Sequence, residues 1–189
     1  MKNLIIISAP SGTGKTTLCK KLQMRFPEIK WSVSYTTREK RLYETNGSDY
    51  NFISMNLFEN LIAKNAFAEY QNVHGNFYGT GKKVLEETVN GNKFLLMELD
   101  VKGALSIKSL YPKETVMIFI TPPSISDLKI RLKKRNTETD KIIKLRLNRI
   151  EEEMQYKSKF DYIILNNKLE IAFQELKNII LKNKDKVEK

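Results

Sequence analysis

Residues 4–17 read LIIISAPSGTGKTT, and the order of residue types in this stretch decides the fold. Leu4 to Ile7 form an apolar, largely β-branched run that is too short for a helix, so it predicts a buried strand. Glycines at 12 and 14 interrupt regular structure, and apolar residues at 18, 22 and 26 then recur at helical spacing. The stretch therefore predicts a strand, a glycine-rich loop and a helix in direct succession.

The loop between this strand and helix has the composition of a phosphate-binding loop (P-loop). Glycine lets the backbone curl so that successive N–H groups point at phosphate oxygens, and the helix dipole adds to the attraction. The ammonium of Lys15 can bridge the outer phosphates, and the hydroxyl of Thr16 can bind Mg²⁺. A Gly/Ser turn without function is the alternative, and Ala9 stands where the usual pattern has its first glycine. The flanking strand and helix favour a nucleoside triphosphate site made of Ala9, Pro10, Ser11, Gly12, Thr13, Gly14, Lys15, Thr16 and Thr17.

Length and composition set the class of protein. The 189 residues, 41% hydrophobic and 29% charged, suit one domain, or one core with an inserted lobe. No apolar run approaches the roughly 20 residues that a membrane span needs, and Met1-Lys2-Asn3 leaves no room for a signal peptide. The single cysteine, Cys19, cannot form an internal disulfide. We expect a cytoplasmic protein without a membrane partner.

The formal net charge of +11 has two interpretations. One is nucleic-acid binding, and the other is a pocket for two polyanionic nucleotides on a generally basic surface. The sequence has no helix-turn-helix, zinc-finger or aromatic RNA-binding signature, which favours small nucleotides over nucleic acid. It leaves open whether the protein is a monomer or a homodimer.

Beyond the first helix, apolar strand-like segments alternate with helical ones. The predicted strands are 31–34, 94–99, 116–120 and 162–165, and the predicted helices are 82–90, 101–110, 124–135, a helix through 143–154, and 169–181. Near-continuous apolar strands between helices predict an α/β fold of the P-loop NTPase type, with helices on both faces of a parallel sheet. Residues 35–81 interrupt this alternation with a helix at 56–64 and a strand at 67–73. They predict an inserted lobe with a small sheet of its own.

A polar segment of the inserted lobe carries a candidate phosphate site. Arg38 and Arg41 can both reach one phosphate, and a guanidinium fork matches phosphate oxygens geometrically. Tyr50 and Tyr78 can donate phenolic hydrogen bonds to the same group. A basic surface loop is the alternative for two arginines taken in isolation.

Glu69 is an unusual residue for its place, between apolar neighbours in a predicted strand. Its carboxylate can accept two parallel hydrogen bonds from N1–H and the 2-amino group of guanine, and adenine offers no such pair. The hydroxyls of Ser34 and Thr80 can add contacts to the purine edge. A surface carboxylate on an edge strand is the alternative.

Taken together, these segments resemble the guanylate kinase family almost from end to end. The stretches that carry the resemblance are APSGTGKTT, SVSYTTREKR, GSDYNFIS, NVHGNFYGT, LLMELDVKGA, IFITPPS and FDYIILNN. The resemblance implies Mg²⁺-dependent transfer of the γ-phosphoryl group of ATP to GMP or dGMP, giving ADP and GDP or dGDP. It also implies a core (1–33, 82–125 and 147–189), a GMP-binding lobe (34–81) and a helical lid (126–146).

The resemblance further implies roles for individual residues. The GMP phosphate falls to Arg38, Arg41, Tyr50 and Tyr78, and the guanine base to Ser34, Glu69 and Thr80. Asp100 lies near both GMP and the water shell of the metal. Lys15, Arg38 and three lid arginines (Arg131, Arg135 and Arg146) converge on the transferred phosphate. Asn166 matches a position associated with adenine, and Asn167 replaces the usual aspartate of the family.

Two rival functions remain. Guanylate-kinase-like domains also serve as peptide-binding scaffolds, but these typically have a degraded P-loop, whereas Gly14, Lys15 and Thr16 are intact. A kinase for another nucleoside monophosphate is the second rival, and Glu69 argues for guanine.

Overall fold

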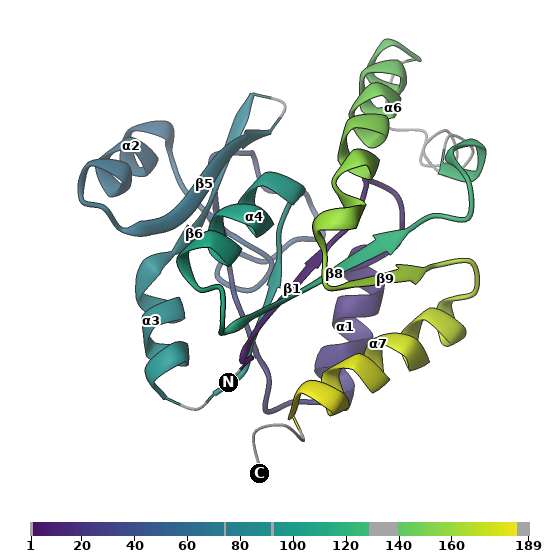
Figure 1. Cartoon of the computed structure of the whole chain (residues 1–189). Helices are drawn as coiled ribbons and strands as arrows, with labels where there is room; N and C mark the ends of the chain where they lie inside the picture. The colour runs from purple at the N-terminus through teal and green to yellow at the C-terminus, as the bar shows by residue number, and fades with distance from the viewer. Residues whose placement is uncertain (1, 74, 92, 129–139, 185–189) are drawn as a thin grey trace.

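The computed structural model describes residues 2–73, 75–91, 93–128 and 140–184, with only the course of the helix over 140–146. Its centre is a five-stranded parallel sheet in the order β2–β7–β1–β8–β9 (Figure 1). All five residues of the middle strand, β1, are buried. The strand bounds are Leu4–Ser8 for β1, Lys30–Trp31 for β2, Leu95–Glu98 for β7, Thr115–Thr121 for β8 and Tyr162–Leu165 for β9.

Helices cover both faces of this sheet because successive side chains of each buried strand point to opposite sides. On one face, alternate residues of β1 pack with α1 (Lys15–Arg25) and α7 (Leu169–Lys184). The other residues of β1 pack with α3 (Lys82–Asn90) and α4 (Val101–Leu110). The predicted three-layer α/β fold is confirmed.

A second, four-stranded sheet is built from the segment between β2 and α3. Its order is β4–β3–β6–β5, with one parallel and two antiparallel pairings, so it is a mixed sheet as predicted. The strands are β3 (Tyr35–Thr36), β4 (Asn51–Phe52), β5 (Phe67–Val73) and β6 (Asn76–Gly81). Helix α2 (Met55–Ala63) packs on this sheet through Phe58, which is fully buried.

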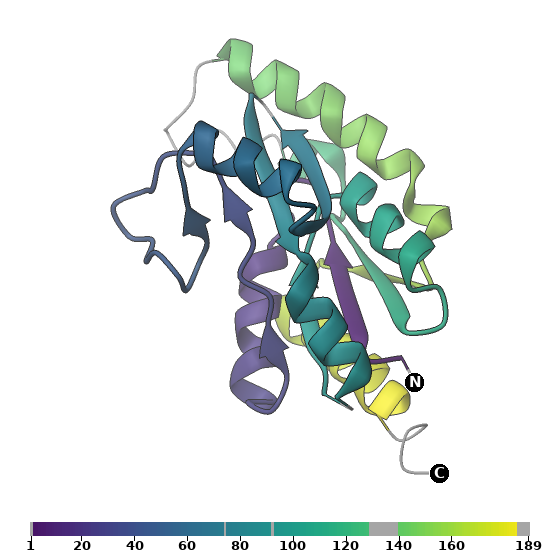
Figure 2. The same cartoon turned by 90° about the vertical axis from the view of Figure 1, so that its left-hand side faces the viewer.

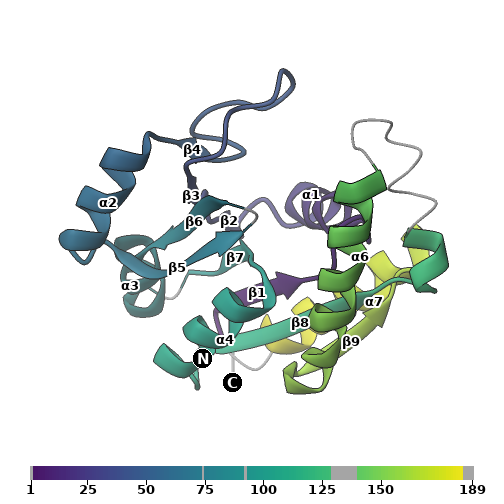
Figure 3. The ribbon, with the colours of Figure 1, turned by 90° about the horizontal axis from the view of Figure 1, so that it is seen from above.

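Helix α6 (Asp140–Gln155) lies on the other side of β1 and α1 from the small sheet, as Figure 3 shows from above. In Figure 2 the purple arrow of β1 points toward the end of the molecule that carries the small sheet and α6. The carboxyl ends of the central strands therefore open between the small sheet and α6, the usual place for a ligand in an open parallel sheet.

Most predicted elements agree with the structure to within two residues, and two differ. Strand β2 ends at Trp31 instead of residue 34. Ser32 N still donates to Leu96 O of the central sheet at 2.9 Å, but the Ser34 carbonyl accepts from Asn51 N of the small sheet at 2.8 Å. Helix α7 continues to Lys184, beyond the predicted end at residue 181. Of the helix predicted over 124–135, the structure describes residues 124–128, which are helical from residue 125. None of the helices in the described ranges is both long and apolar enough to span a bilayer.

Candidate active site

The P-loop joins β1 to α1 and has the conformation that its glycines predict. Gly12 and Gly14 have φ of 83° and 94°, a left-handed region that side chains disfavour. Gly14 is also the N-cap of α1 and has no side chain to satisfy the first N–H groups of the helix. Asn166 supports the loop from behind, because its amide Nδ2 donates to Thr13 O at 2.6 Å. The loop and the first turn of α1 therefore present backbone N–H donors at a helix N-terminus, a site suited to phosphate.

Lys15 and Thr16 meet a carboxylate at the end of β7. Lys15 Nζ lies 3.7 Å from Glu98 Oε1 and 3.4 Å from Leu99 O, and Thr16 Oγ1 donates to Glu98 Oε1 at 2.7 Å. The hydroxyl of Thr16 and the carboxylate of Glu98 are oxygen ligands of the kind that suits Mg²⁺, which keeps most of its water and takes phosphate oxygens as further ligands. No group of three or more His, Cys, Asp or Glu side chains within the described residues could hold a metal by itself. The donor set therefore fits an ion that arrives with a phosphate.

Two adjoining clefts surround these groups. The first has a volume of about 330 Å³ and is bordered by the P-loop, the small sheet, the ends of β1 and β7, and α6. The second has a volume of about 1520 Å³ and runs between α1 and the polar loop 37–50, here called the acceptor loop. Five residues line both clefts: Thr16, Ser34, Tyr50, Tyr78 and Glu98.

Glu69 and Thr80 face each other across β5 and β6, which confirms that Glu69 lies on a strand but not at a solvated edge. Glu69 is 8% exposed, and Thr80 Oγ1 donates to its Oε1 at 2.6 Å. Gly103, near the start of α4, makes room for this carboxylate, since a Cβ there would lie 2.7 Å from Glu69 Oε2. Burial raises the pKa of Glu69 to about 7, aided by the negative charge of Asp100 and opposed by the Thr80 hydrogen bond. A carboxylate kept this basic and dry is suited to accept hydrogen bonds from a ligand.

The acceptor loop holds Arg38 among aromatic rings. Its guanidinium carbon lies 5.6 Å from the centre of the Tyr50 ring and 5.5 Å from that of Phe52. The Tyr50 and Tyr78 rings meet edge to face at 5.8 Å. Burial raises the pKa of the Tyr50 phenol, so its hydroxyl remains a hydrogen-bond donor at neutral pH. Three of the four predicted phosphate ligands therefore lie together, and the side chain of the fourth, Arg41, is about half exposed.

Asp100 links the start of α4 to α6. Its Oδ1 caps α4 by accepting from Gly103 N at 2.8 Å, and its Oδ2 accepts from Arg149 Nη2 at 3.2 Å. Arg149 also donates through Nε to Glu153 Oε1 at 2.9 Å. A continuous polar network therefore joins the end of β7 to α6.

The predicted site residues fall into three groups. Those that line a cleft are residues 9–17, Ser34, Arg38, Arg41, Tyr50, Glu69, Tyr78 and Asp100. Thr80 and Asn166 are buried and contact cleft residues, and an adenine contact of Asn166 stays a prediction. Arg131 and Arg135 lie outside the described residues, and Arg146 is described only as part of the course of α6.

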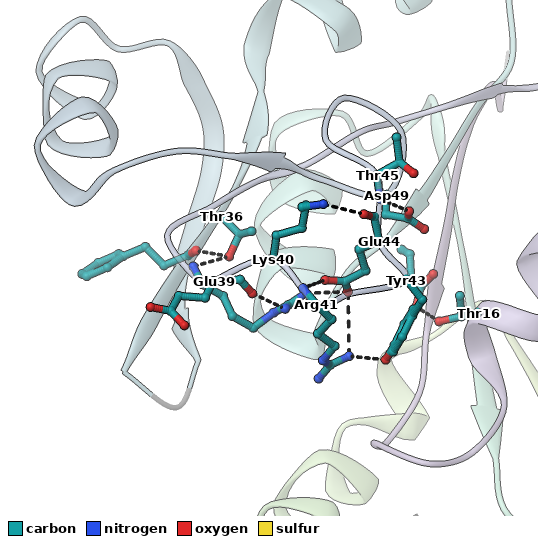
Figure 4. Close-up of polar contacts among 12 residues, drawn as sticks. Thr16, Thr36, Glu39, Lys40, Arg41, Tyr43, Glu44, Thr45 and Asp49 are labelled. Atoms are coloured by element: carbon teal, nitrogen blue, oxygen red, sulfur yellow. Dashed lines mark hydrogen bonds and ion pairs between the residues drawn. The ribbon is translucent and has the colours of Figure 1, made fainter. Parts of the chain in front are cut away.

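Sequence reasoning missed four charged residues of this region. Glu98, Arg149 and Glu153 line the first cleft, and Glu44 contacts Arg38 and Arg41 of the acceptor loop (Figure 4). Glu98 stands two residues before Asp100 at the carboxyl end of β7, where ligands of parallel sheets bind, so its position was a usable signal. The other three are ordinary residues of charged segments, and only their tertiary contacts distinguish them.

Comparisons with known proteins agree with this geometry. The family model described as guanylate kinase matches residues 1–183. The guanylate kinase of Geobacter metallireducens is 44% identical over 178 residues, which cover 94% of this chain and 87% of that protein. The guanylate kinase of Syntrophotalea carbinolica is 43% identical over 178 residues, which cover 94% of this chain and 84% of that protein.

The fold has a match among solved structures as well. The crystal structure of guanylate kinase from Anaplasma phagocytophilum superposes with a TM-score of 0.78 at 30% sequence identity, covering 95% of this chain and 85% of the other. A family match along nearly the whole length, relatives above 40% identity and the same fold lead to one conclusion: the chain belongs to the guanylate kinase family.

Proposed function

We propose that this chain transfers the γ-phosphoryl group of ATP to GMP, forming ADP and GDP. The observation that carries the proposal is a single cleft lined by the whole P-loop and by Glu69, Tyr50 and Tyr78. A P-loop alone suits many nucleotide hydrolases, and a buried carboxylate alone suits many purine sites. One cavity lined by both suits a donor and an acceptor nucleotide together. The proposed contacts go to phosphate and base, so dGMP is expected to serve as well.

Selection of guanine is assigned to Glu69. Guanine presents N1–H and the 2-amino group side by side, and the carboxylate can accept both hydrogen bonds. Guanine binding would favour the ionised form of a group whose pKa is about 7 in the free protein. Thr80 orients the carboxylate, and Ser34 lines the same cleft. Adenine would leave this buried acceptor unpaired, which is how such sites discriminate strongly.

The acceptor needs no general base. A phosphate monoester has a second pKa near 6, so it is largely dianionic at neutral pH and is already a competent nucleophile. The requirement is electrostatic, because two repelling phosphate groups must be held in line while charge moves to the leaving oxygen. Lys15, Arg38 and the P-loop N–H groups supply positive charge and fixed dipoles. Arg131, Arg135 and Arg146 are proposed to complete this set from the lid.

Mg²⁺ is proposed to bind through Thr16 and the phosphates, with Asp100 acting through water. When bound, the ion neutralises phosphate charge and orients the transferred group. The Thr16 hydroxyl that now donates to Glu98 would turn toward it. Cytoplasmic location is part of the proposal, because the nucleotide substrates and the buried, free Cys19 thiol suit a reducing compartment.

Closure of the two outer parts over the core is proposed to prevent hydrolysis of ATP. The lobe 34–81 and the lid 126–146 would approach the core 1–33, 82–125 and 147–189 only when both nucleotides are bound. ATPase activity measured without GMP tests this idea. Hydrolysis at a rate comparable to the kinase rate would contradict gating.

The experiment that tests the activity measures ADP formation from Mg-ATP with GMP, dGMP, AMP, CMP or UMP as the acceptor. We expect GMP to give the highest kcat/KM. A higher value for another nucleotide would assign a different monophosphate kinase. No ADP with any acceptor would favour a binding scaffold.

A further inference from the structure

Glu44 is a buried carboxylate in a loop that is otherwise polar and basic. It is 8% exposed, and both of its oxygens have partners. Oε1 accepts from Arg38 Nη2 at 2.7 Å, and Oε2 accepts from Arg41 N at 2.8 Å (Figure 4). Burial by itself would raise the pKa of Glu44, but the Arg38 and Arg41 hydrogen bonds outweigh it and lower the pKa. The group is therefore an anion at neutral pH that bridges two arginines.

Arg38 is held in one orientation by this carboxylate and its surroundings. Its Nη1 donates to Glu39 O at 2.6 Å, its side chain is 16% exposed, and its guanidinium lies over the rings of Tyr50 and Phe52. A guanidinium carries five N–H donors, so donors remain for a ligand after these two bonds. Arg38 is thus ordered before a phosphate arrives and keeps N–H donors available for it.

Arg41 is treated differently by the same carboxylate. Glu44 fixes the backbone N–H of Arg41, whereas the Arg41 side chain is 51% exposed. Its Nη1 lies 3.8 Å from Glu44 Oε1 and donates to Tyr43 Oη at 3.4 Å. Fixing the backbone sets where the side chain starts, and the guanidinium is held by longer, more exposed contacts with Glu44 and Tyr43. One arginine is therefore prepositioned and the other is anchored at its backbone.

We propose that Glu44 is a positioning residue for the phosphate of the acceptor nucleotide, acting through Arg38 and Arg41. The proposal rests on the proposed function, which gives these arginines the acceptor phosphate. The carboxylate offsets repulsion between two guanidinium groups in one short loop and leaves a net positive charge for a dianion. Ordering the donors in advance reduces the entropy lost on binding. The carboxylate of Glu44 contacts Arg38 and Arg41, whereas Glu69 pairs with Thr80, so Glu44 should act on the phosphate and not on the base.

Calorimetric titration with GMP and with guanosine separates these two contributions, because guanosine has the base and no phosphate. Glu44→Gln keeps the shape of the side chain and removes its charge. We expect its Kd for GMP to rise about tenfold or more, since a charged hydrogen-bond partner is lost, while its Kd for guanosine stays within about twofold. Glu39→Gln is the matched control, because the Glu39 side chain is exposed and only its carbonyl contacts Arg38.

A double-mutant cycle tests the route through the arginine. Glu44→Gln should reduce the affinity for GMP by a smaller factor in an Arg38→Ala background than in the wild type. Equal decreases in the affinities for GMP and guanosine would make Glu44 a general support of the loop and would overturn the proposal. Unchanged affinity for GMP would overturn it as well. If Glu44→Gln does not unfold cooperatively, Glu44→Asp, which keeps the charge on a shorter chain, is titrated with the same two ligands. Wild-type protein that forms no ADP with GMP would instead overturn the proposed function.

Discussion

The P-loop and the acceptor loop border two adjoining clefts that share Thr16 and Tyr50, and each loop carries groups suited to a phosphate. The P-loop relies on backbone geometry, with two left-handed glycines at the start of α1. The acceptor loop relies on charged side chains, which must be ordered by partners such as Glu44. A backbone site is encoded in consecutive residues, whereas a side-chain site is assembled from separate strands and loops. The two loops should therefore respond differently to substitution.

Lys15→Ala should have the largest effect, because Lys15 is the charged side chain that the P-loop adds to its backbone donors. Loss of one preorganised donor typically costs about a hundredfold in rate, so kcat should fall at least that much. The melting temperature should change little, because its contacts with Glu98 and Leu99 are long. Arg25→Ala, at an exposed position of the same helix that borders neither cleft, is the control. Retained kcat would contradict the role of Lys15.

Glu69→Gln should come second and should affect the acceptor alone. We expect the KM for GMP to rise at least about tenfold and the KM for ATP to stay within about twofold, since the carboxylate is proposed to contact guanine and not ATP. Steady-state kinetics with each substrate varied in turn measures both values. Equal changes in the two would refute the base-reading role.

The same substitution gives a pH signature. The folded pKa of Glu69, about 7, lies above its ordinary value of 4.5, so the free energy of unfolding decreases as pH rises from about 4.5 to about 7. Glu69→Gln removes this pH-dependent decrease. The free energy of unfolding of the ligand-free variant should exceed that of the wild type by roughly 2 kcal/mol at pH 8, with no difference at pH 4.5. Wild-type affinity for guanosine, which lacks the phosphate that titrates at about pH 6, should depend on pH through the state of Glu69: it should decrease below about pH 7, and the variant should not show this decrease. Denaturant unfolding and titration at several pH values measure both effects.

Gly14→Ala should rank third and separates the two loops directly. Residue 14 has φ of 94°, and an added Cβ would lie 2.7 Å from Asn166 Nδ2, so the P-loop must distort. We expect the KM for ATP to rise about tenfold and the stability to fall by about 1–3 kcal/mol. Gly47→Ala in the acceptor loop is the control, because Gly47 has φ of 78° but open space around its Cβ position. It should lose about 1 kcal/mol and leave the KM for ATP unchanged, and equal effects of the two substitutions would contradict the steric argument.

Arg149→Ala should have the smallest effect. Arg149 is partly exposed and reaches the site through Asp100 and Glu153, so we expect a fewfold decrease in kcat and little change in either KM. Arg149→Lys should restore part of the rate if charge matters more than the two-pronged geometry. A decrease as large as that of Lys15→Ala would place Arg149 in direct contact with the transferred group.

The sequence by itself determined the parts of this protein whose physics is local. The P-loop, the buried strands β1 and β8 and the helices α3 and α4 follow from periodicity, glycine placement and apolar runs within a few consecutive residues. The family and its acceptor also followed from motif order, and Glu69 stood out as an acid between apolar neighbours. These features need no knowledge of which segments meet.

Only the tertiary structure decided which distant groups share a cavity. Strand order brings the end of β7 beside β1 and so places Glu98 against Lys15 and Thr16. The adenine contact of Asn166 stays a prediction, and only the folded structure shows that its amide donates to Thr13 O of the P-loop. Glu44 and Arg149 looked like ordinary surface charges, because a charge becomes informative only when burial and its partner are known. Burial depends on packing between segments far apart in the chain, and local sequence does not contain it.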